Sequence, residues 1–352
     1  MNHIDPRGRE FSSEGIAAEH RRNNYDFIRL LAACFVLFSH MYALVGQQEP
    51  IVVGDYTFGG IGLLIFFSIS GCLVTVSWLN DPDPKRFFAR RFLRIWPALA
   101  VVVVLSAFVI APNFGDKSLI SLFSTRQFWL FLSNLTFIPP YKGLAGFAGH
   151  AISDVNGSLW TIPIEFLCYV VTVFIIGRNL QKGRWRLVAA MAAMALYYFA
   201  VVSGRDLLHF IASHLFVGRF LSLWLFFAVG AAIAVFLDAK PRLTAVAAGV
   251  LIGLLFIAFG QPIVGLLIAL PVATVAVGQA SWPFVRGIGR WGDFSYGLYL
   301  YAWPCQQIVV RIFRDTKPVF LEAVISLGLA LICAGISWFM VERPALRLKP
   351  RR

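Results

Sequence analysis

The stretch "NNYDFIRLLAACFVLFSHMYALV", residues 23–45, indicates a membrane-spanning helix that carries two ionisable side chains. About 20 predominantly apolar residues are needed to cross a bilayer as a helix, and this run has that length. It is interrupted by Arg29 near its start and by His40 near its end. Because it lacks a small-x-small cleavage site, we expect a retained first span and not a signal peptide.

Arg29 and His40 are predicted to lie on one face of this helix. They are eleven residues apart, about 20° from three full turns, and about 16 Å apart along the axis. Asp26, one turn before Arg29, could hold the guanidinium group. One interpretation is that Arg29 extends to lipid headgroups while His40 bonds to a neighbouring helix. Because ionisable groups in hydrocarbon are costly, the shared face favours a polar site or pathway.

The composition of the whole chain agrees with a membrane protein. Of its 352 residues, 59% are hydrophobic and 14% charged, whereas soluble domains are about half apolar and about a quarter charged. We expect an all-α, polytopic helical bundle in one membrane domain, residues 25–344. A flexible cytoplasmic tail (1–24) precedes it, and a basic cytoplasmic tail (345–352) follows. The cysteines lie in apolar segments without metal-ligand spacing, so we expect no metal.

Ten apolar runs are long enough to be membrane spans. They lie at roughly 26–46, 57–79, 92–111, 159–177, 187–203, 215–236, 243–259, 262–280, 294–311 and 320–341. An eleventh run, "QFWLFLSNLTFIPP" (127–140), is short and ends in two prolines. Whether this run crosses the membrane decides the orientation of every later span.

The distribution of basic residues argues against an eleventh crossing. Without it, 22 Lys and Arg residues lie on the side of the two termini and 7 on the opposite side. Because cytoplasmic loops are enriched in Lys and Arg, we predict about ten transmembrane helices with both termini cytoplasmic. Residues 112–158 then form an outer loop with a re-entrant or surface helix. The net charge of +13 reflects this topology and anionic lipid headgroups, so no nucleic-acid partner is expected.

A row of arginines opens the third span in "PKRFFARRFLRIWP", residues 84–97. Arg90 and Arg94 are four residues apart, and Arg91 and Arg94 are three apart, so one helix face presents their guanidinium groups. Such groups could simply anchor the helix at the cytoplasmic boundary. Because guanidinium forks suit phosphate oxygens, the row beside Arg29 favours a phosphate-rich cytosolic ligand.

Glu165 lies in an apolar segment that begins with "GSLWTIPIEFLCY", residues 157–169. In the predicted topology it is near the outer side of the membrane. A carboxylate there is costly unless it is paired or protonated. It could balance Arg219, orient His40 or assist in proton transfer, and we predict a role in the site.

Two further stretches have structural interpretations. In "FFSISGCL" (66–73), Ser70 and Gly71 are small enough to let helices approach closely. In "GDFSYGLYLYAWP" (292–304), the aromatic residues are typical of a belt at the membrane interface. Either stretch could also line a cavity. The chain has no P-loop, dinucleotide fingerprint or G-x-S-x-G motif.

Five of these features, in this order, resemble the acyltransferase 3 family. They are Arg29 followed by ten residues and His40, "FFSISGCL", "FFARRFLRIWP", "LWTIPIEFLCY" and "SYGLYLYAWP". The resemblance runs from about Tyr25 to Pro344, nearly the whole chain. Members of this family are multi-span bacterial inner-membrane proteins that acylate carbohydrates and other envelope molecules.

The resemblance implies ten spans, a multi-pass position in the bacterial inner membrane, and acyl-CoA as the donor, with acetyl-CoA expected first. It implies essential roles for His40 and for three donor-binding arginines, Arg29, Arg91 and Arg94. Glu165 matches the carboxylate of the family's Trp-Ser/Thr-Leu-x-x-Glu pattern. Some members have a soluble domain after the spans, so we expect a separate periplasmic partner protein wherever the transfer needs one.

Together, the residues and the resemblance predict an O-acyltransferase embedded in membrane lipids. The arginines would bind the phosphates of acyl-CoA, and His40 would act as general base on a hydroxyl of a carbohydrate or glycolipid. Expected acceptors are an exopolysaccharide, a lipopolysaccharide or a lipo-oligosaccharide. A transient acyl-histidine is the mechanistic variant. The alternative function is a transporter or flippase for a lipid-linked or anionic envelope substrate, although we find no inverted repeat.

Overall fold

The computed structural model describes most of the chain from residue 23 onward. The described ranges are 3–4, 10–11, 23–203, 216–285, 287–290, 292–313 and 317–350. Most of the predicted N-terminal tail (1–24) and the end of the predicted C-terminal tail (345–352) lie outside these ranges. The division into a membrane domain and two tails therefore stays a prediction.

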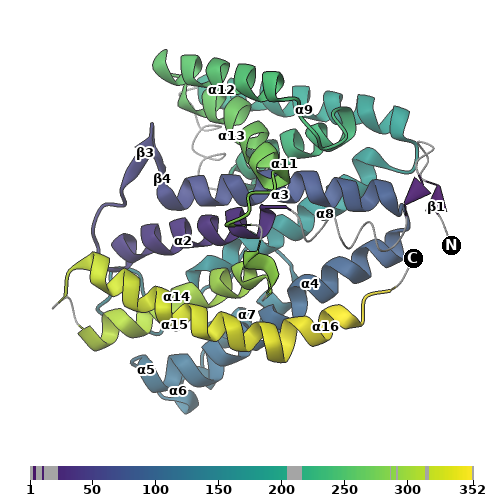
Figure 1. Ribbon diagram of the computed structural model, residues 1–352. Helices are drawn as coiled ribbons and strands as arrows, with labels where there is room; N and C mark the ends of the chain where they lie inside the picture. The colour runs from purple at the N-terminus through teal and green to yellow at the C-terminus, as the bar shows by residue number, and fades with distance from the viewer. Residues whose placement is uncertain are drawn as a thin grey trace.

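Packed helices form the body of the protein (Figure 1). A helix overlaps each of the ten predicted spans. These helices are α2 (Tyr25–Leu44), α3 (Phe58–Asn80), α4 (Pro84–Leu105), α8 (Thr161–Ile176), α9 (Leu180–Ser203), α11 (Phe216–Phe236), α12 (Leu243–Ala258), α13 (Pro262–Gln279), α14 (Phe294–Phe313) and α15 (Val319–Ser337). A π-helical turn extends α4 into α5 (Ala111–Phe114), and another joins α15 to α16 (Arg343–Arg347).

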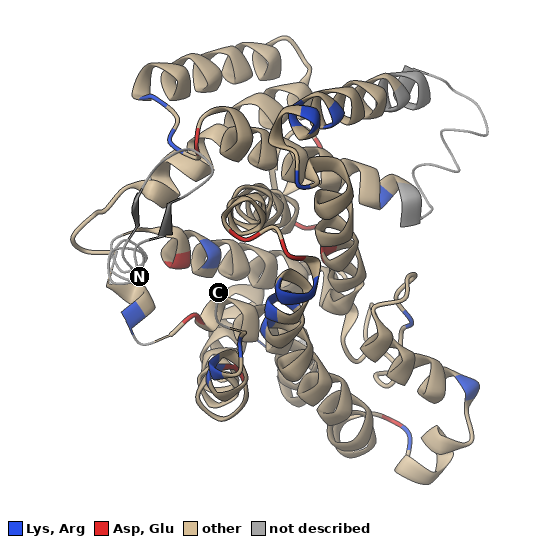
Figure 2. Ribbon diagram, turned by 90° about the vertical axis from the view of Figure 1, so that its right-hand side faces the viewer, with Lys and Arg blue, Asp and Glu red and all other residues tan. Residues whose placement is uncertain are grey.

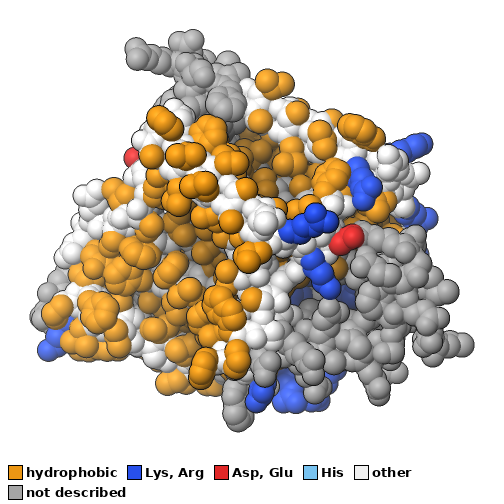
Figure 3. All heavy atoms as spheres, turned by 45° about the horizontal axis from the view of Figure 1, so that its top comes forward, with side chains coloured by type: hydrophobic (Ala, Val, Ile, Leu, Met, Phe, Trp, Pro, Cys, Tyr) orange, Lys and Arg blue, Asp and Glu red, His pale blue; other side chains and the backbone are white. Residues whose placement is uncertain are grey.

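Among the described residues, 7 helical stretches are long and apolar enough to cross a membrane. Helix α12 is also apolar but has 16 residues. Hydrophobic side chains cover much of the face shown in Figure 3, with groups of Lys and Arg toward its right-hand edge. The protein is thus an all-α, multi-pass membrane protein. The count of ten crossings and the cytoplasmic position of the termini stay predictions.

The described strands are short and form two antiparallel pairs. Strand β1 (His3–Ile4) pairs with β2 (Glu10–Phe11), and β3 (Ile51–Val53) pairs with β4 (Tyr56–Thr57). The second pair is a hairpin between α2 and α3, at the opposite end of the molecule from α16 (Figure 1). Gly54 supplies the left-handed backbone, with φ of +55°, that its turn requires.

Small residues let α3 pack closely against α11, as the stretch at 66–73 predicts. A side chain added to Gly71 would overlap the backbone of Phe227 in α11, and one added to Gly230 would overlap the backbone of Ser68. Glycines allow this close approach of helix backbones in membranes. Helix α3 also packs against α2, so it lies between α2 and α11 in the middle of the bundle.

The segment between α5 and α8 contains short helices. Helix α6 (Leu119–Phe123) precedes α7 (Arg126–Leu132). With 7 residues, α7 is about 10 Å long, a third of the hydrocarbon thickness. After α7 the chain lies against α4 and α8: Trp96 Nε1 donates to the Leu135 carbonyl (3.1 Å), and the Phe137 and Phe166 rings stack 4.7 Å apart. The eleventh apolar run therefore packs against two long helices and forms no spanning helix.

Residues 150–160 run in the opposite direction beside α14. Trp303 Nε1 donates to the carbonyl of Asp154 (2.9 Å), and Asn156 Nδ2 donates to the carbonyl of Leu300 (3.0 Å). These bonds satisfy backbone groups that hydrocarbon would leave without partners. The segment therefore enters the bundle before α8 begins.

Helix α8 consequently begins beside the second turn of α14. The hydroxyl groups of Thr161, the first residue of α8, and Tyr299 lie 2.6 Å apart. Glu165 lies one turn further and lines the same cavity as Ser295, in the first turn of α14. Its expected position near the outer side is therefore wrong. That expectation assumes a helix that starts at the membrane surface, whereas the chain reaches Thr161 through a 3-10 turn (Gly157–Trp160) that already lies against α14.

Candidate active site

A cavity of about 90 Å³ lies between α2, α3, α4, α8 and α14. Four of the five predicted site residues line it: Arg29, Arg91, Arg94 and Glu165. His40 is not among the lining residues. The structure thus brings the predicted arginines and the carboxylate into one place and leaves the imidazole outside it.

Both stretches with structural interpretations contribute to the cavity wall. Ser70 lines it from α3, and Tyr296 and Tyr299 line it from α14. Tyr301 and Trp303 are also buried, each 6% exposed. The prediction of an interfacial aromatic belt at 292–304 is therefore wrong, because these side chains face the interior of the bundle. The alternative, that these stretches line a cavity, is confirmed.

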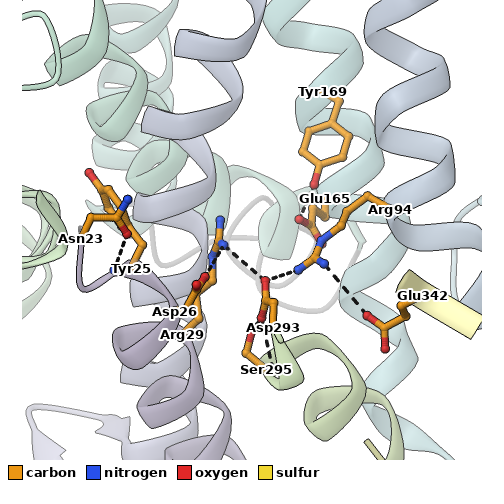
Figure 4. A network of polar contacts seen from close by, with 10 residues as sticks. All are labelled: Asn23, Tyr25, Asp26, Arg29, Arg94, Glu165, Tyr169, Asp293, Ser295 and Glu342. Carbon is orange, nitrogen blue, oxygen red and sulfur yellow. Dashed lines mark hydrogen bonds and ion pairs between the residues drawn. The ribbon is translucent and has the colours of Figure 1, made fainter. Parts of the chain in front are cut away.

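Asp293, directly before α14, joins two of the arginines (Figure 4). Its carboxylate forms an ion pair with Arg94 and lies 3.5 Å from Arg29 Nη1. It also accepts hydrogen bonds from the backbone and hydroxyl of Ser295. Burial acts to raise the pKa of Asp293, but Arg94 and Arg29 outweigh it and lower that pKa to about 2. Asp293 therefore stays ionised and links the start of α2 to α4.

A second acid approaches Arg94 from the end of α15. Glu342 is 2% exposed, and its Oε2 lies 4.0 Å from Arg94 Nη1. Ser337 donates a hydrogen bond of 3.0 Å to the other carboxylate oxygen. The contacts of Arg94 and Asp293 therefore hold four segments together: the beginnings of α2 and α14, the middle of α4 and the end of α15.

Arg91 differs from its neighbours because it has no acidic partner among the described residues. Its Nη2 donates to Ser77 Oγ (2.9 Å), and its Nε is buried without a hydrogen-bond partner. The guanidinium lies 5.7 Å from the centre of the Phe87 ring and 5.8 Å from that of Tyr169. A guanidinium with unused donors in a cavity wall can bind an anion.

Glu165 accepts a hydrogen bond from the Tyr169 hydroxyl, one turn further along α8. No described ion pair joins it to Arg219, which the sequence offered as a partner. The guanidinium of Arg219 instead lies over the Trp160 ring, 5.2 Å from its centre. Glu165 therefore places a carboxylate in the same cavity as Arg91, with Tyr169 in contact with both side chains.

His40 contacts α14 at a different level from Arg29. Its ring packs edge-on against Trp303, with 4.8 Å between the centroids. Its Nδ1 is buried without a hydrogen-bond partner among the described residues. Because Arg29 meets Asp293 just before α14 and His40 meets Trp303 within it, both side chains face α14. The predicted shared face is therefore confirmed.

A short barrier separates the cavity from His40. Tyr299 lines the cavity and lies one turn before Trp303 on α14. Its hydroxyl donates to the Ser158 carbonyl (2.9 Å), and its ring meets that of Phe66 edge-on at 5.8 Å. The described structure thus closes the cavity one helical turn short of the residue that contacts His40.

Three residues of this site were not predicted from the sequence: Asp293, Glu342 and Tyr169. Asp293 lies next to an apolar run and not within one, so a search for ionisable groups inside spans passes over it. Glu342, in "VERP", directly follows the last predicted span and so also lies outside it. Pairing these acids with Arg94 would have been the signal, but it requires knowing which helix ends meet.

The site is built from cations, carboxylates and an imidazole. Among the described residues, no group of three or more His, Cys, Asp or Glu side chains could hold a metal ion. The arrangement can bind an anion at the arginines and can transfer a proton at the imidazole.

Similarity to known proteins assigns the chain to a class of membrane enzymes. The model of the acyltransferase domain family matches residues 22–339, and the chain therefore belongs to the acyltransferase 3 family. An O-acetyl transferase of Shigella phage Sf6 is 32% identical over 337 residues, which cover 92% of this chain and 96% of that protein. Nodulation protein 10 of Rhizobium leguminosarum bv. viciae is 28% identical over 367 residues, which cover 93% of this chain and 94% of that protein.

A longer relative is the peptidoglycan O-acetyltransferase OatA of Listeria monocytogenes. It is 24% identical over 337 residues, which cover 81% of this chain and 51% of that protein. No solved structure matches the chain. The family makes the protein an O-acyltransferase of the membrane, and relatives named as O-acetyl transferases are similar to it over most of its length.

Proposed function

We propose that the enzyme transfers an acetyl group from acyl-CoA to a hydroxyl of a carbohydrate. The observation that carries this proposal is the buried guanidinium of Arg91, which has no acidic partner among the described residues and lines a cavity with Arg29 and Arg94. The carbohydrate acceptor is supported by the relative named for peptidoglycan, which is a glycan polymer. An exopolysaccharide, a lipopolysaccharide and a lipo-oligosaccharide are the acceptors to test.

The donor binds through its phosphate groups. Guanidinium groups bind phosphate oxygens in a bidentate manner, and such bonds are strong where water is excluded. In the proposed complex, the phosphates lie against Arg91 and Arg94, with Arg29 beside them, and the pantetheine arm passes the apolar wall formed by residues such as Leu63 and Phe66. This orientation directs the thioester toward the end of the cavity near Tyr299.

His40 is the proposed general base. It takes the proton from the acceptor hydroxyl while the hydroxyl oxygen attacks the thioester carbonyl carbon. The carbon–sulfur bond then breaks, and the departing coenzyme A sulfur takes the proton from the imidazolium. The unpartnered Nδ1 supports this role, because no described group blocks that nitrogen. A transient acyl-histidine is the variant in which His40 itself attacks the thioester.

The donor must reach from the arginines to His40. The two ends of this path, Arg29 and His40, are about 16 Å apart along α2, of the same order as an extended pantetheine arm. Because the cavity ends at Tyr299, its side chain moves aside when the thioester reaches the imidazole.

Glu165 is proposed to act on a substrate. No described contact joins it to His40, so a role in orienting the imidazole has no support in the geometry. Its carboxylate, bonded to Tyr169, faces the same cavity as the arginines. There it can accept a hydrogen bond from the pantetheine arm or from the acceptor.

The proposed setting is the bacterial inner membrane, with the arginines at the cytoplasmic face and both termini in the cytoplasm. The bias of basic residues supports this orientation. Cytosolic acyl-CoA would then enter from the side of the arginines, and an envelope carbohydrate would approach His40 from the other side.

The test is transfer of labelled acetyl from acetyl-CoA in inverted membrane vesicles that contain the acceptor. Wild type is compared with His40→Gln, which keeps a polar side chain against Trp303 and removes the titratable ring. Both proteins are brought to equal amounts, and retention of fold is checked by their elution in detergent. Label in the glycan fraction for wild type alone supports the proposal, and equal transfer in both would exclude His40 as the base. Substrate movement without thioester turnover would support the transporter.

A further inference from the structure

The last described residues of the chain return to the arginines. After Glu342 the chain forms α16, which packs against α4, the helix that carries Arg90, Arg91 and Arg94. Figure 1 shows α16 extending from α15 toward the beginning of α4. Figure 2 views the molecule from this side, where basic and acidic segments gather near the middle. Lys349 follows α16 by two residues and is half-buried.

Lys349 lies in a strongly cationic environment. Burial, followed by the charges of Arg94, Arg91 and Arg90, lowers its pKa to about 8, and Asp293 acts in the opposite direction. No described acidic group lies within ion-pair distance of its ammonium group. Burying a lysine among arginines without an acid is unfavourable. Such a position is understandable if an anion occupies the space between these groups.

Among Arg90, Arg91, Arg94 and Lys349, two have an acidic partner in the described part of the chain and two do not. Arg90 forms an ion pair with Asp81 (2.6 Å), and Arg94 forms one with Asp293. Arg91, in the cavity wall, and Lys349, on the segment that covers α4, have no acidic partner in the described part of the chain. Arg91 lines the cavity and Lys349 does not, so Lys349 lies outside the cavity wall.

Coenzyme A has phosphate groups at two places in a fixed order from the thioester. The pantetheine arm leads first to the diphosphate and then to the ribose, whose 3′-phosphate is the outermost. If the thioester points into the cavity, the diphosphate meets the inner cation and the 3′-phosphate meets the outer one. The order of the unpaired cations therefore matches the order of the phosphates.

We propose that Lys349 binds the 3′-phosphate of the acyl-CoA donor, while Arg91 and Arg94 bind its diphosphate. The inference rests on the proposed function, because it takes acyl-CoA as the donor. It assigns the segment after α16 a role in donor recognition, because Lys349 supplies a cation outside the cavity wall.

The experiment combines two donors with four proteins. The donors are acetyl-CoA and acetyl-dephospho-CoA, which lacks the 3′-phosphate. The proteins are wild type, Lys349→Ala, Lys349→Arg and the matched control Arg347→Ala, an exposed position two residues away with the same charge. For each combination of donor and protein, KM of the donor and kcat are measured with the same acceptor.

The expected results are those of losing one contact, between Lys349 and the 3′-phosphate of the donor. Lys349→Ala raises KM for acetyl-CoA about tenfold, the usual effect of losing one charge-assisted hydrogen bond. It leaves kcat unchanged, and it leaves KM for acetyl-dephospho-CoA at the wild-type value. Lys349→Arg restores most of the affinity, and Arg347→Ala behaves as wild type.

Two kinds of result overturn the inference alone. In the first, Lys349→Ala has wild-type KM for both donors. In the second, it raises KM for both donors equally, which would assign Lys349 a general effect of charge or of structure. If wild type consumes neither thioester, the proposed function fails, and the inference fails with it.

Discussion

The two ends of the substrate path differ in how they hold their ionisable groups. At the arginine end, defined by Arg29, Arg91, Arg94 and Asp293, charges are held by other charges from distant segments. At the histidine end, defined by His40, Trp303 and Asp154, a single ionisable ring packs against an aromatic ring, and the neighbouring bonds go to backbone carbonyls. The first arrangement fixes cations for an anionic ligand, whereas the second leaves a nitrogen free for proton transfer.

This comparison predicts that substitutions at the two ends affect different kinetic constants. The largest effect is expected at His40. His40→Gln should lower kcat about 1,000-fold, within the usual range for a general base, with KM for acetyl-CoA unchanged. Steady-state transfer at saturating donor measures this. If His40→Gln instead raised KM for acetyl-CoA by a similar factor, His40 would belong to the donor site, and the distinction between the two ends would be lost.

The next effect in size is expected at Asp293, whose carboxylate separates two guanidinium groups. Asp293→Asn should lower the free energy of unfolding by about 3 kcal/mol, because a buried ion pair loses one partner. Added coenzyme A should then stabilise the variant more than wild type, since its phosphates replace the lost charge. Thermal unfolding in detergent with and without coenzyme A checks both points.

Asp55→Asn is the matched control, because it makes the same chemical change in the exposed hairpin at the other end of the molecule. It should leave both melting temperatures at the wild-type values. If Asp293→Asn also leaves them there, the carboxylate does not organise the arginine end.

Arg91 is expected to have a smaller effect, confined to donor affinity. Arg91→Ala should raise KM for acetyl-CoA about 30-fold through lost charge-assisted bonds, with little change in kcat. Arg91→Lys should restore part of the loss, since an ammonium group keeps the charge but not the bidentate fork. Arg86→Ala, which removes a partly exposed arginine of the same helix that pairs with Asp81, is the control. Equal effects of Arg86→Ala and Arg91→Ala would argue for general electrostatics.

The pH dependence of donor binding should reveal the titration of the Lys349 ammonium group. Its pKa of about 8 means that the ammonium form dominates at pH 7 and the neutral amine at pH 9. Only the charged form attracts phosphate, so KM for acetyl-CoA should rise about fivefold over that interval. Lys349→Arg should flatten the profile, because arginine stays protonated. A profile that is identical in both proteins would assign the titration to another group.

The smallest effect is expected at the barrier between the ends. Tyr299→Phe removes the hydroxyl that bonds to Ser158 and contacts Thr161. Losing such a bond should let the barrier open more easily and raise acceptor-independent hydrolysis of acetyl-CoA about threefold. Tyr301→Phe, on the same helix and outside the cavity lining, should leave hydrolysis unchanged. Unchanged hydrolysis in Tyr299→Phe as well would show that its hydroxyl does not hold the cavity closed.

The sequence predicted the helical segments and much of the arginine end. The spacing of Arg29 and His40 is a local property of one helix, so their common face could be predicted, whereas the contact of that face with α14 could not. The same is true of Arg91 and Arg94. The short helices between α5 and α8 also agree with the charge argument against an eleventh crossing.

The rest depends on contacts between segments that are distant in sequence. Asp293 could not be recognised as the link between Arg29 and Arg94 until α2, α4 and α14 were brought together. Glu165 was expected at the wrong depth because hydropathy does not reveal that the preceding chain enters the bundle before α8 begins. The tyrosines of 292–304 resemble a membrane-interface belt in composition, and burial against α4 and α8 gives them a different role.

The segment 150–160, which lies beside α14, also has a consequence for biogenesis. Its backbone carbonyls accept hydrogen bonds from side chains of α14, which is synthesised much later, as the bond from Trp303 Nε1 to the Asp154 carbonyl illustrates (sequence separation 149). Lipid offers such groups no hydrogen bonds, so the segment cannot take its place when α8 is inserted. It must remain in a hydrated environment until α14 arrives. Completion of the site is therefore a late step of membrane assembly, and chains stopped before α14 should leave this segment open to protease.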